Sequence, residues 1–140
     1  QRYMNKISGP LLDRIDIHLR LRPLDTRVML AARRGEPSSA VAERVLRARI
    51  AQKHRFAGEN IFTNAEMNNK QIEKYCVLSD KCREVMEKVM DKMSLSMRAY
   101  HRILRVARTI ADLEGTDDIL AAHVVEAAGY RFLDRQNLES

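Results

Sequence analysis

The stretch "SMRAYHRILRVARTIADLEG", from Ser96 to Gly115, predicts one long amphipathic helix and thereby decides the fold class. Its apolar residues recur every three or four positions, as they do on the core-facing side of a helix. That face consists of Ala99, Ile103, Val106, Ala107 and Ile110. Ser96 is suited to cap the first turn, and Gly115 suits the left-handed position just past the last turn. A mainly α-helical domain is expected around this helix.

An earlier helix is predicted after the loop "RRGEPSS" (Arg33–Ser39). Ser38 or Ser39 can cap it, and "AGEN" (Ala57–Asn60) ends it. Its apolar face consists of Ala42, Val45, Leu46 and Ile50.

Three more helices complete the expected bundle. Thr63 and Glu66 have capping-box spacing for a short helix that runs to about Tyr75. Ser79 can cap the next helix, and its apolar stripe, which is expected to fill the core, is Val85, Met86, Val89, Met90 and Met93. Thr116 is expected to cap the last helix, whose inner side is Leu120, Val124, Ala127 and Ala128.

Before the helices, residues 15–21 alternate between apolar and polar side chains and predict one β-strand, which Pro23 ends. A single strand leaves its backbone groups and its apolar face without partners, so it is expected to be the last strand of a sheet upstream, in a longer protein. A hairpin partner at Val28–Leu30 is the alternative.

The composition limits the class of protein. The chain has 140 residues, a net charge of +6 and a pI of about 9.6, and the basic excess lies in its first 60 residues. Such a charge is compatible with an anionic partner and equally with a solvated basic surface. The sequence contains neither a secretory signal nor an apolar run long enough to span a membrane, so a cytoplasmic protein is expected. Cys76 and Cys82 are expected to be reduced structural thiols.

The motifs give little support for catalysis by this chain alone. No phosphate-binding glycine loop, HExxH motif or metal-ligand cluster is present, so no metal site is predicted. The four histidines are scattered and are expected to be structural or exposed: His18, His54, His101 and His123.

Arginines are the remaining candidates for chemistry. Arg98, Arg102 and Arg105 lie along one stripe of the Ser96 helix, with Arg108 adjacent. Arg98 lies in the first turn, where free backbone N–H groups and the helix dipole favour a phosphate. A solvated helix face explains the same spacing equally well. Arg14 stands between Asp13 and Asp16, either in a surface salt bridge or aimed at a group outside the chain.

Three stretches together closely resemble the C-terminal part of the ComM-type, magnesium-chelatase-like AAA+ ATPases. They are "RYMNKISGPLLDRIDIHLRL", "LSMRAYHRILRVARTIADLEG" and "HVVEAAGYRFLDR", and the likeness runs in order from about Tyr3 to Arg135. The sequence is more distantly similar to the magnesium chelatase ATPase subunit and to MCM helicases. This resemblance implies that residues 1–35 are the end of an α/β nucleotide-binding core and that residues 36–140 are its helical lid.

The resemblance also implies roles for two arginines. Arg14 matches the arginine finger, which reaches into the ATP site of the neighbouring subunit, and Arg98 matches the sensor-2 arginine of the lid. Walker A, Walker B and sensor 1 would lie before residue 1. The full-length protein is then expected to be a hexameric ATPase ring that uses ATP and Mg²⁺ in DNA processing such as competence, branch migration or helicase-like work. No cofactor is expected in this chain alone.

Two other functions remain open at the level of sequence. The helical bundle could be a stand-alone nucleic-acid-binding module that follows phosphates with Arg44, Arg47, Arg49, Lys53 and Arg55. The chain could also be part of a chelatase subunit that drives metal insertion into a porphyrin.

Overall fold

The computed structural model describes residues 11, 14–19, 21, 23, 26–27 and 35–131 of the chain. These residues form a helical bundle without a β-strand, which confirms the mainly α-helical class. Its elements are α3 (Ser38–Arg55), the 3₁₀ helix η2 (Asn64–Glu66), α4 (Asn69–Tyr75), α5 (Asp80–Met93), α6 (Met97–Glu114) and α7 (Ala121–Gly129). No helix in the described part of the chain is long and apolar enough to cross a membrane.

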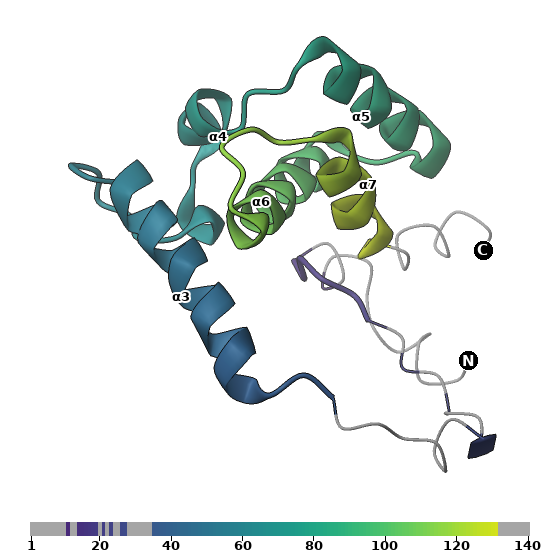
Figure 1. Cartoon of the computed structure of the whole chain (residues 1–140). Coiled ribbons are helices and arrows are strands. Elements are labelled where there is room, and N and C mark those ends of the chain that lie inside the picture. Colours follow the sequence, from purple (N-terminus) through teal and green to yellow (C-terminus); the bar gives the residue numbers. More distant parts are fainter. Residues whose placement is uncertain are drawn as a thin grey trace.

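The long helix α6 lies at the centre of the bundle (Figure 1). It packs against α7, α3, η2 and α4, while α5 packs against α7. Ala99, Ile103, Ala107 and Ile110 of α6 are buried, as the apolar period predicts, while Val106 is partly buried. Both predicted ends are confirmed, since Ser96 Oγ accepts a hydrogen bond from the Ala99 N–H at 3.2 Å and Gly115 is left-handed with φ +75°.

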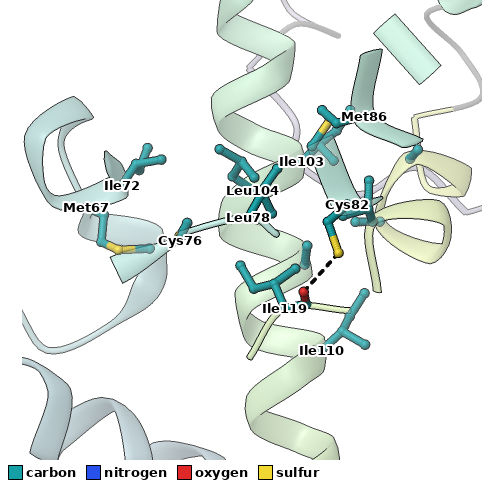
Figure 2. Close-up of a cluster of buried hydrophobic side chains, with 14 of the residues drawn as sticks. Met67, Ile72, Cys76, Leu78, Cys82, Met86, Ile103, Leu104, Ile110 and Ile119 are labelled. Atoms are coloured by element: carbon teal, nitrogen blue, oxygen red, sulfur yellow. Dashed lines mark hydrogen bonds between the residues drawn. The ribbon is translucent and has the colours of Figure 1, made fainter. Parts of the chain in front are cut away.

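The hydrophobic core fills the space between α6 and the elements around it (Figure 2). It draws on Met67 and Ile72 from one side, on Ile103 and Leu104 of α6, and on Met86 of α5. Met86 and Met93 are buried, so the methionines of α5 fill the core as predicted.

Both cysteines are buried in this core and neither forms a disulfide. Burial raises the pKa of the Cys76 thiol to about 11. The thiol of Cys82 donates to the carbonyl oxygen of Ile119 at 3.2 Å, across the gap between α5 and the loop before α7 (Figure 2). These contacts fit the structural role expected for both side chains.

Two predicted helix caps are wrong. Pro37, not Ser38 or Ser39, occupies the N-cap of α3. Thr116 does not cap α7, because that helix begins only at Ala121 and the Thr116 hydroxyl donates to the carbonyl oxygens of Ala111 and Asp118. The cap of α7 comes from within the helix, where His123 Nδ1 accepts from the Leu120 N–H at 3.0 Å.

The capping box of Thr63 and Glu66 is present, but the helix that it begins is shorter than predicted. Glu66 accepts from the Thr63 N–H at 2.9 Å, yet η2 ends at Glu66 itself. Met67 then turns extended, with ψ 129°, and a second box formed by Asn68 and Gln71 begins α4. Two short helices therefore replace the single one expected.

The apolar face predicted for α3 is exposed. Leu46 and Ile50 are 60% and 47% accessible, and Ala42 and Val45 are exposed as well. The side of α3 that meets the bundle instead buries Ala48 and Gln52. Polar contacts decide this orientation, because Gln52 accepts from the Asn64 N–H at 3.1 Å.

The strand expected at residues 15–21 is absent from the described residues. The backbone N–H of His18 donates to the Tyr130 carbonyl at 2.7 Å, and Ile17 and Leu19 are exposed. A strand needs a second strand beside it, and the described part of the chain offers none. The hairpin alternative at Val28–Leu30 lies outside the described residues.

A cluster around Glu59 fixes α4 to the turn after α3. The Glu59 carboxylate accepts from Gln71 Nε2 at 2.8 Å, Tyr75 Oη at 2.8 Å and Lys74 Nζ at 3.2 Å. These hydrogen bonds, that of Gln71 first, lower the pKa of Glu59 from 4.5 to about 2. A carboxyl group with a lowered folded pKa stabilises the fold above its unfolded pKa and loses that contribution as it is protonated.

The chain is therefore expected to lose thermal stability between about pH 4.5 and pH 2, with Glu59 as one of the groups responsible. Thermal melts over this range should show a shallower decline for Glu59→Gln than for the unmodified chain. Glu73→Gln, an exposed position on α4, is the control. An equally steep decline in both variants would show that Glu59 does not contribute.

Candidate functional site

The four arginines of α6 differ sharply in burial, so they do not form one solvated face. Arg98, in the first turn, is exposed, whereas Arg102 and Arg105 are partly buried and Arg108 is buried. The last three donate hydrogen bonds to three different loops. The arginine stripe predicted from the sequence therefore contains three side chains that are at least partly buried, and Arg98, whose side chain is exposed.

Arg108 fixes the loop that leads to α7. Its guanidinium donates to the carbonyl oxygens of Thr116 at 2.7 Å and Asp117 at 2.6 Å. Its Nε also donates to the carboxylate of Asp112 at 3.2 Å, one turn later on α6. Arg108 thus fixes the C-terminal end of α6 to the loop that follows it.

Asp112 is the centre of a buried polar network that joins α3, η2 and α6. Its side chain is 1% exposed and accepts two hydrogen bonds from Arg55, at 2.8 and 2.5 Å. Asn64 Nδ2 donates to it at 2.8 Å, and Arg108 completes the set. Bidentate arginine–carboxylate pairs of this kind are strong and geometrically specific. No motif in the sequence predicts this network as a whole, and only the i, i+4 spacing of Arg108 and Asp112 indicates a part of it.

Arg105 holds the break between η2 and α4. Its Nε and Nη2 donate to the Met67 carbonyl at 3.1 and 2.7 Å. Burial lowers the pKa of Arg105 from its ordinary value. The role of Arg105 is therefore to fix a loop of the bundle.

Arg102 connects the two candidate site residues. It donates to the backbone carbonyl of Arg14 at 3.0 Å and forms an ion pair with Asp16. Because Arg102 lies four residues after Arg98, about one helical turn, the Arg14 segment is held next to the first turns of α6. Asp16, considered from sequence as a partner for Arg14, bonds Arg102 instead, and Asp13 lies outside the described residues.

The side chains of Arg14 and Arg98 are both exposed. An arginine is charged at all physiological pH values, and its planar fork matches the oxygens of a phosphate. Arg98 also lies at the positive end of the α6 dipole, where an anion is favoured. The guanidinium of Arg14 and that of Arg98 can each therefore stabilise the charge of a phosphate. Among the described residues, no cluster of histidine, cysteine and carboxylate side chains could hold a metal ion.

The basic segment of α3 is less available for nucleic acid than its composition implies. Arg44 forms two hydrogen bonds with Glu36, at 2.6 and 3.0 Å, and Arg47 pairs with Glu43 at 3.0 Å. Arg55 points into the buried network around Asp112. These three arginines are engaged by carboxylates of the chain itself.

Two family models match the chain in sequence order. The model described as "Magnesium chelatase, subunit ChlI C-terminal" matches residues 35–131. The model described as "Magnesium chelatase, subunit ChlI" matches residues 1–29. Together they include both Arg14 and Arg98.

Curated proteins show the same relationship. The competence protein ComM of Haemophilus influenzae is 47% identical over 136 residues, which cover 96% of this chain and 26% of that protein. The protein YifB of Escherichia coli is 39% identical over the same shares of the two sequences. A protein of Mycobacterium bovis, Mb2921c, is 35% identical over 94% of this chain. The chain thus spans about a quarter of the length of these relatives.

Proposed function

The chain belongs to the magnesium chelatase subunit ChlI family, as a C-terminal region of the ComM type, and from this premise we propose that it is the lid part of a ring-forming AAA+ ATPase. In this proposal Arg14 is an arginine finger that acts on the ATP of the neighbouring subunit. Arg98 is the sensor-2 arginine, which binds the nucleotide from the lid. ATP and Mg²⁺ are bound by the longer protein.

The main support for this proposal is the hydrogen bond from Arg102 of α6 to the backbone carbonyl of Arg14. Arg14 and Arg98 are far apart in sequence, yet this link fixes both to the same helix, and both side chains remain exposed. Arg108, by contrast, is buried and donates to acceptors inside the bundle. The exposed side chains of Arg14 and Arg98 are suited to a phosphate ligand outside the bundle.

The chemistry of phosphoryl transfer explains why two arginines serve this role. Charge spreads over the equatorial oxygens of the transferred phosphoryl group, and a positioned guanidinium neutralises it. An arginine supplied by a neighbouring subunit raises the rate by about 10³–10⁵ in well-studied NTPases. The guanidinium of Arg14 supplies that charge, and Arg98 donates to the phosphates from the positive end of α6.

The wider assembly is part of the same proposal. A finger that acts in trans requires a neighbouring subunit, and we propose a hexameric ring in the cytoplasm. The name of the competence protein ComM supports DNA processing as the work of this ring. We also propose that residues 1–35 end the nucleotide-binding core and that residues 36–140 form the lid. The family matches, which stop at residue 29 and resume at residue 35, support that boundary.

An Arg98→Ala substitution tests the sensor-2 role. We expect nucleotide affinity of the full-length ring to fall roughly 10- to 100-fold, because a hydrogen bond to a charged group contributes about 1.5–3 kcal/mol. Fluorescent nucleotide titration measures this, with Lys81→Ala in the first turn of α5 as the control. Unchanged affinity together with unchanged turnover in Arg98→Ala would rule out the assignment.

A further inference from the structure

A set of hydrogen bonds clamps the segment from Arg14 to His18 onto the bundle. Arg102 donates to the carbonyl of Arg14 at 3.0 Å, and Arg131 donates to the next carbonyl, that of Ile15, at 2.6 Å. The N–H of His18 donates to the carbonyl of Tyr130 at 2.7 Å. Figure 1 shows the described part of this segment beside the end of α7. The backbone that carries Arg14 is thus fixed by residues of α6 and of the turn after α7.

The burial of the two arginines shows that the clamp is specific. The side chain of Arg102 is only 13% exposed, although its acceptor Asp16 is 40% exposed, and Arg131 is buried. A charged group removed from water in this way needs hydrogen-bond acceptors close to it. Among the described residues, the acceptors found for Arg102 are Arg14 and Asp16. Without the docked segment, the Arg102 guanidinium would lose both of them.

The negative charge of Asp16 strengthens the contact between Arg102 and the segment that carries Arg14. A guanidinium that bonds a carboxylate and a carbonyl together is held in direction as well as in distance. Asp16 follows Arg14 by two residues, so the ion pair and the carbonyl bond hold the backbone on both sides of Ile15. The exposed Arg14 side chain then extends from a fixed starting point.

We infer that Arg102 and Asp16 are a positioning pair for Arg14, an inference that rests on the proposed function. They do not touch the nucleotide. They fix the backbone from which the finger extends, and they fix it to the helix that carries Arg98. A movement of α6 on nucleotide binding therefore moves both arginines together.

The test is the steady-state ATPase of the full-length protein with Arg102→Gln. A finger displaced by about 1 Å loses up to about 100-fold in rate, so kcat should fall by that order while the KM for ATP stays within about twofold. Arg102→Lys keeps the positive charge on a single nitrogen, without the planar fork, and should restore part of kcat. Asp16→Asn is a second variant, and it should also lower kcat, by a smaller factor than Arg102→Gln.

The matched control is Arg105→Gln on the same face of α6. It removes hydrogen bonds of the same type, but from the Met67 carbonyl rather than from the Arg14 segment. If Arg102 only stabilised the bundle, both variants would lower the melting temperature and neither would lower kcat specifically. We expect a specific loss of kcat for Arg102→Gln only.

A double-mutant cycle separates this inference from the proposed function. If Arg102 acts through Arg14, the double variant Arg14→Ala/Arg102→Gln should be no slower than Arg14→Ala alone. Losses that add, or a normal kcat for Arg102→Gln in an intact ring, would overturn the positioning role and leave the finger in place. Normal turnover for Arg14→Ala would overturn both.

Discussion

A ring with Arg14→Ala is expected to bind ATP with near-normal affinity and to hydrolyse it about 10³–10⁵ times more slowly. The reason is that the guanidinium neutralises charge that exists only in the transition state, so its loss affects kcat rather than binding. Steady-state ATPase assays together with nucleotide titration of the full-length protein measure the two effects separately.

Two controls make this result specific to the finger. Arg49→Ala removes another exposed arginine, from α3, and should leave turnover unchanged. Arg14→Lys keeps the charge and loses the planar fork, so it should recover only part of the rate. Because a ring is required, the assembly of each variant is checked by size-exclusion chromatography. Near-normal turnover in an assembled Arg14→Ala ring would contradict the finger assignment.

The second large effect is expected on stability, from Asp112→Ala. This change leaves two guanidinium groups, those of Arg55 and Arg108, without their shared carboxylate in the interior of the bundle. Removing one partner of a buried ion pair typically destabilises a protein by about 3–5 kcal/mol. Urea unfolding of this 140-residue chain, followed by far-UV circular dichroism, measures the change in the free energy of unfolding.

The appropriate comparison is an exposed pair on the same bundle. Glu43→Ala removes the carboxylate that binds Arg47, where both side chains are largely exposed, and such pairs contribute about 0.3–0.5 kcal/mol. Asp112→Asn keeps an acceptor oxygen and should fall between the two. A loss for Asp112→Ala no larger than that for Glu43→Ala would show that the network does not hold the bundle together.

The sequence was most informative where structure depends on neighbours along the chain. The period of α6, its Ser96 cap and its Gly115 end are all local properties, and the structure has all three. The methionine stripe of α5 is local in the same sense, and it lies in the core. Hydrophobic period and cap chemistry are enough to place such elements.

The errors arose where a contact distant in sequence decided the result. Leu46 and Ile50 form an apolar face, but the side of α3 that meets α6 is selected by Gln52 and Arg55 through their bonds to Asn64 and Asp112. Thr116 has a side chain suited to a cap, but Arg108 holds the backbone of Thr116 and Asp117 in a loop, and the helix begins five residues after Thr116. Neither outcome can be read from a local pattern.

The candidate site shows the same difference between local patterns and contacts distant in sequence. Arg14 and Arg98 were identified from motifs that match a family, and these roles remain predictions. The link between them depends on the contact from Arg102 to the Arg14 carbonyl, which joins residues 88 positions apart. From sequence alone, Arg102 was one arginine in a stripe with no assigned role.

The position of the Asp112 network has a mechanical consequence for α3. The residues that this helix buries, Ala48 and Gln52, lie in its C-terminal half, as does Arg55, while its N-terminal half extends past the bundle (Figure 1). An 18-residue helix is about 27 Å long, so a tilt of about 5° at the network displaces its Ser38 end by about 2 Å. A small rotation at Asp112 is thus amplified along α3 into a larger displacement of its Ser38 end.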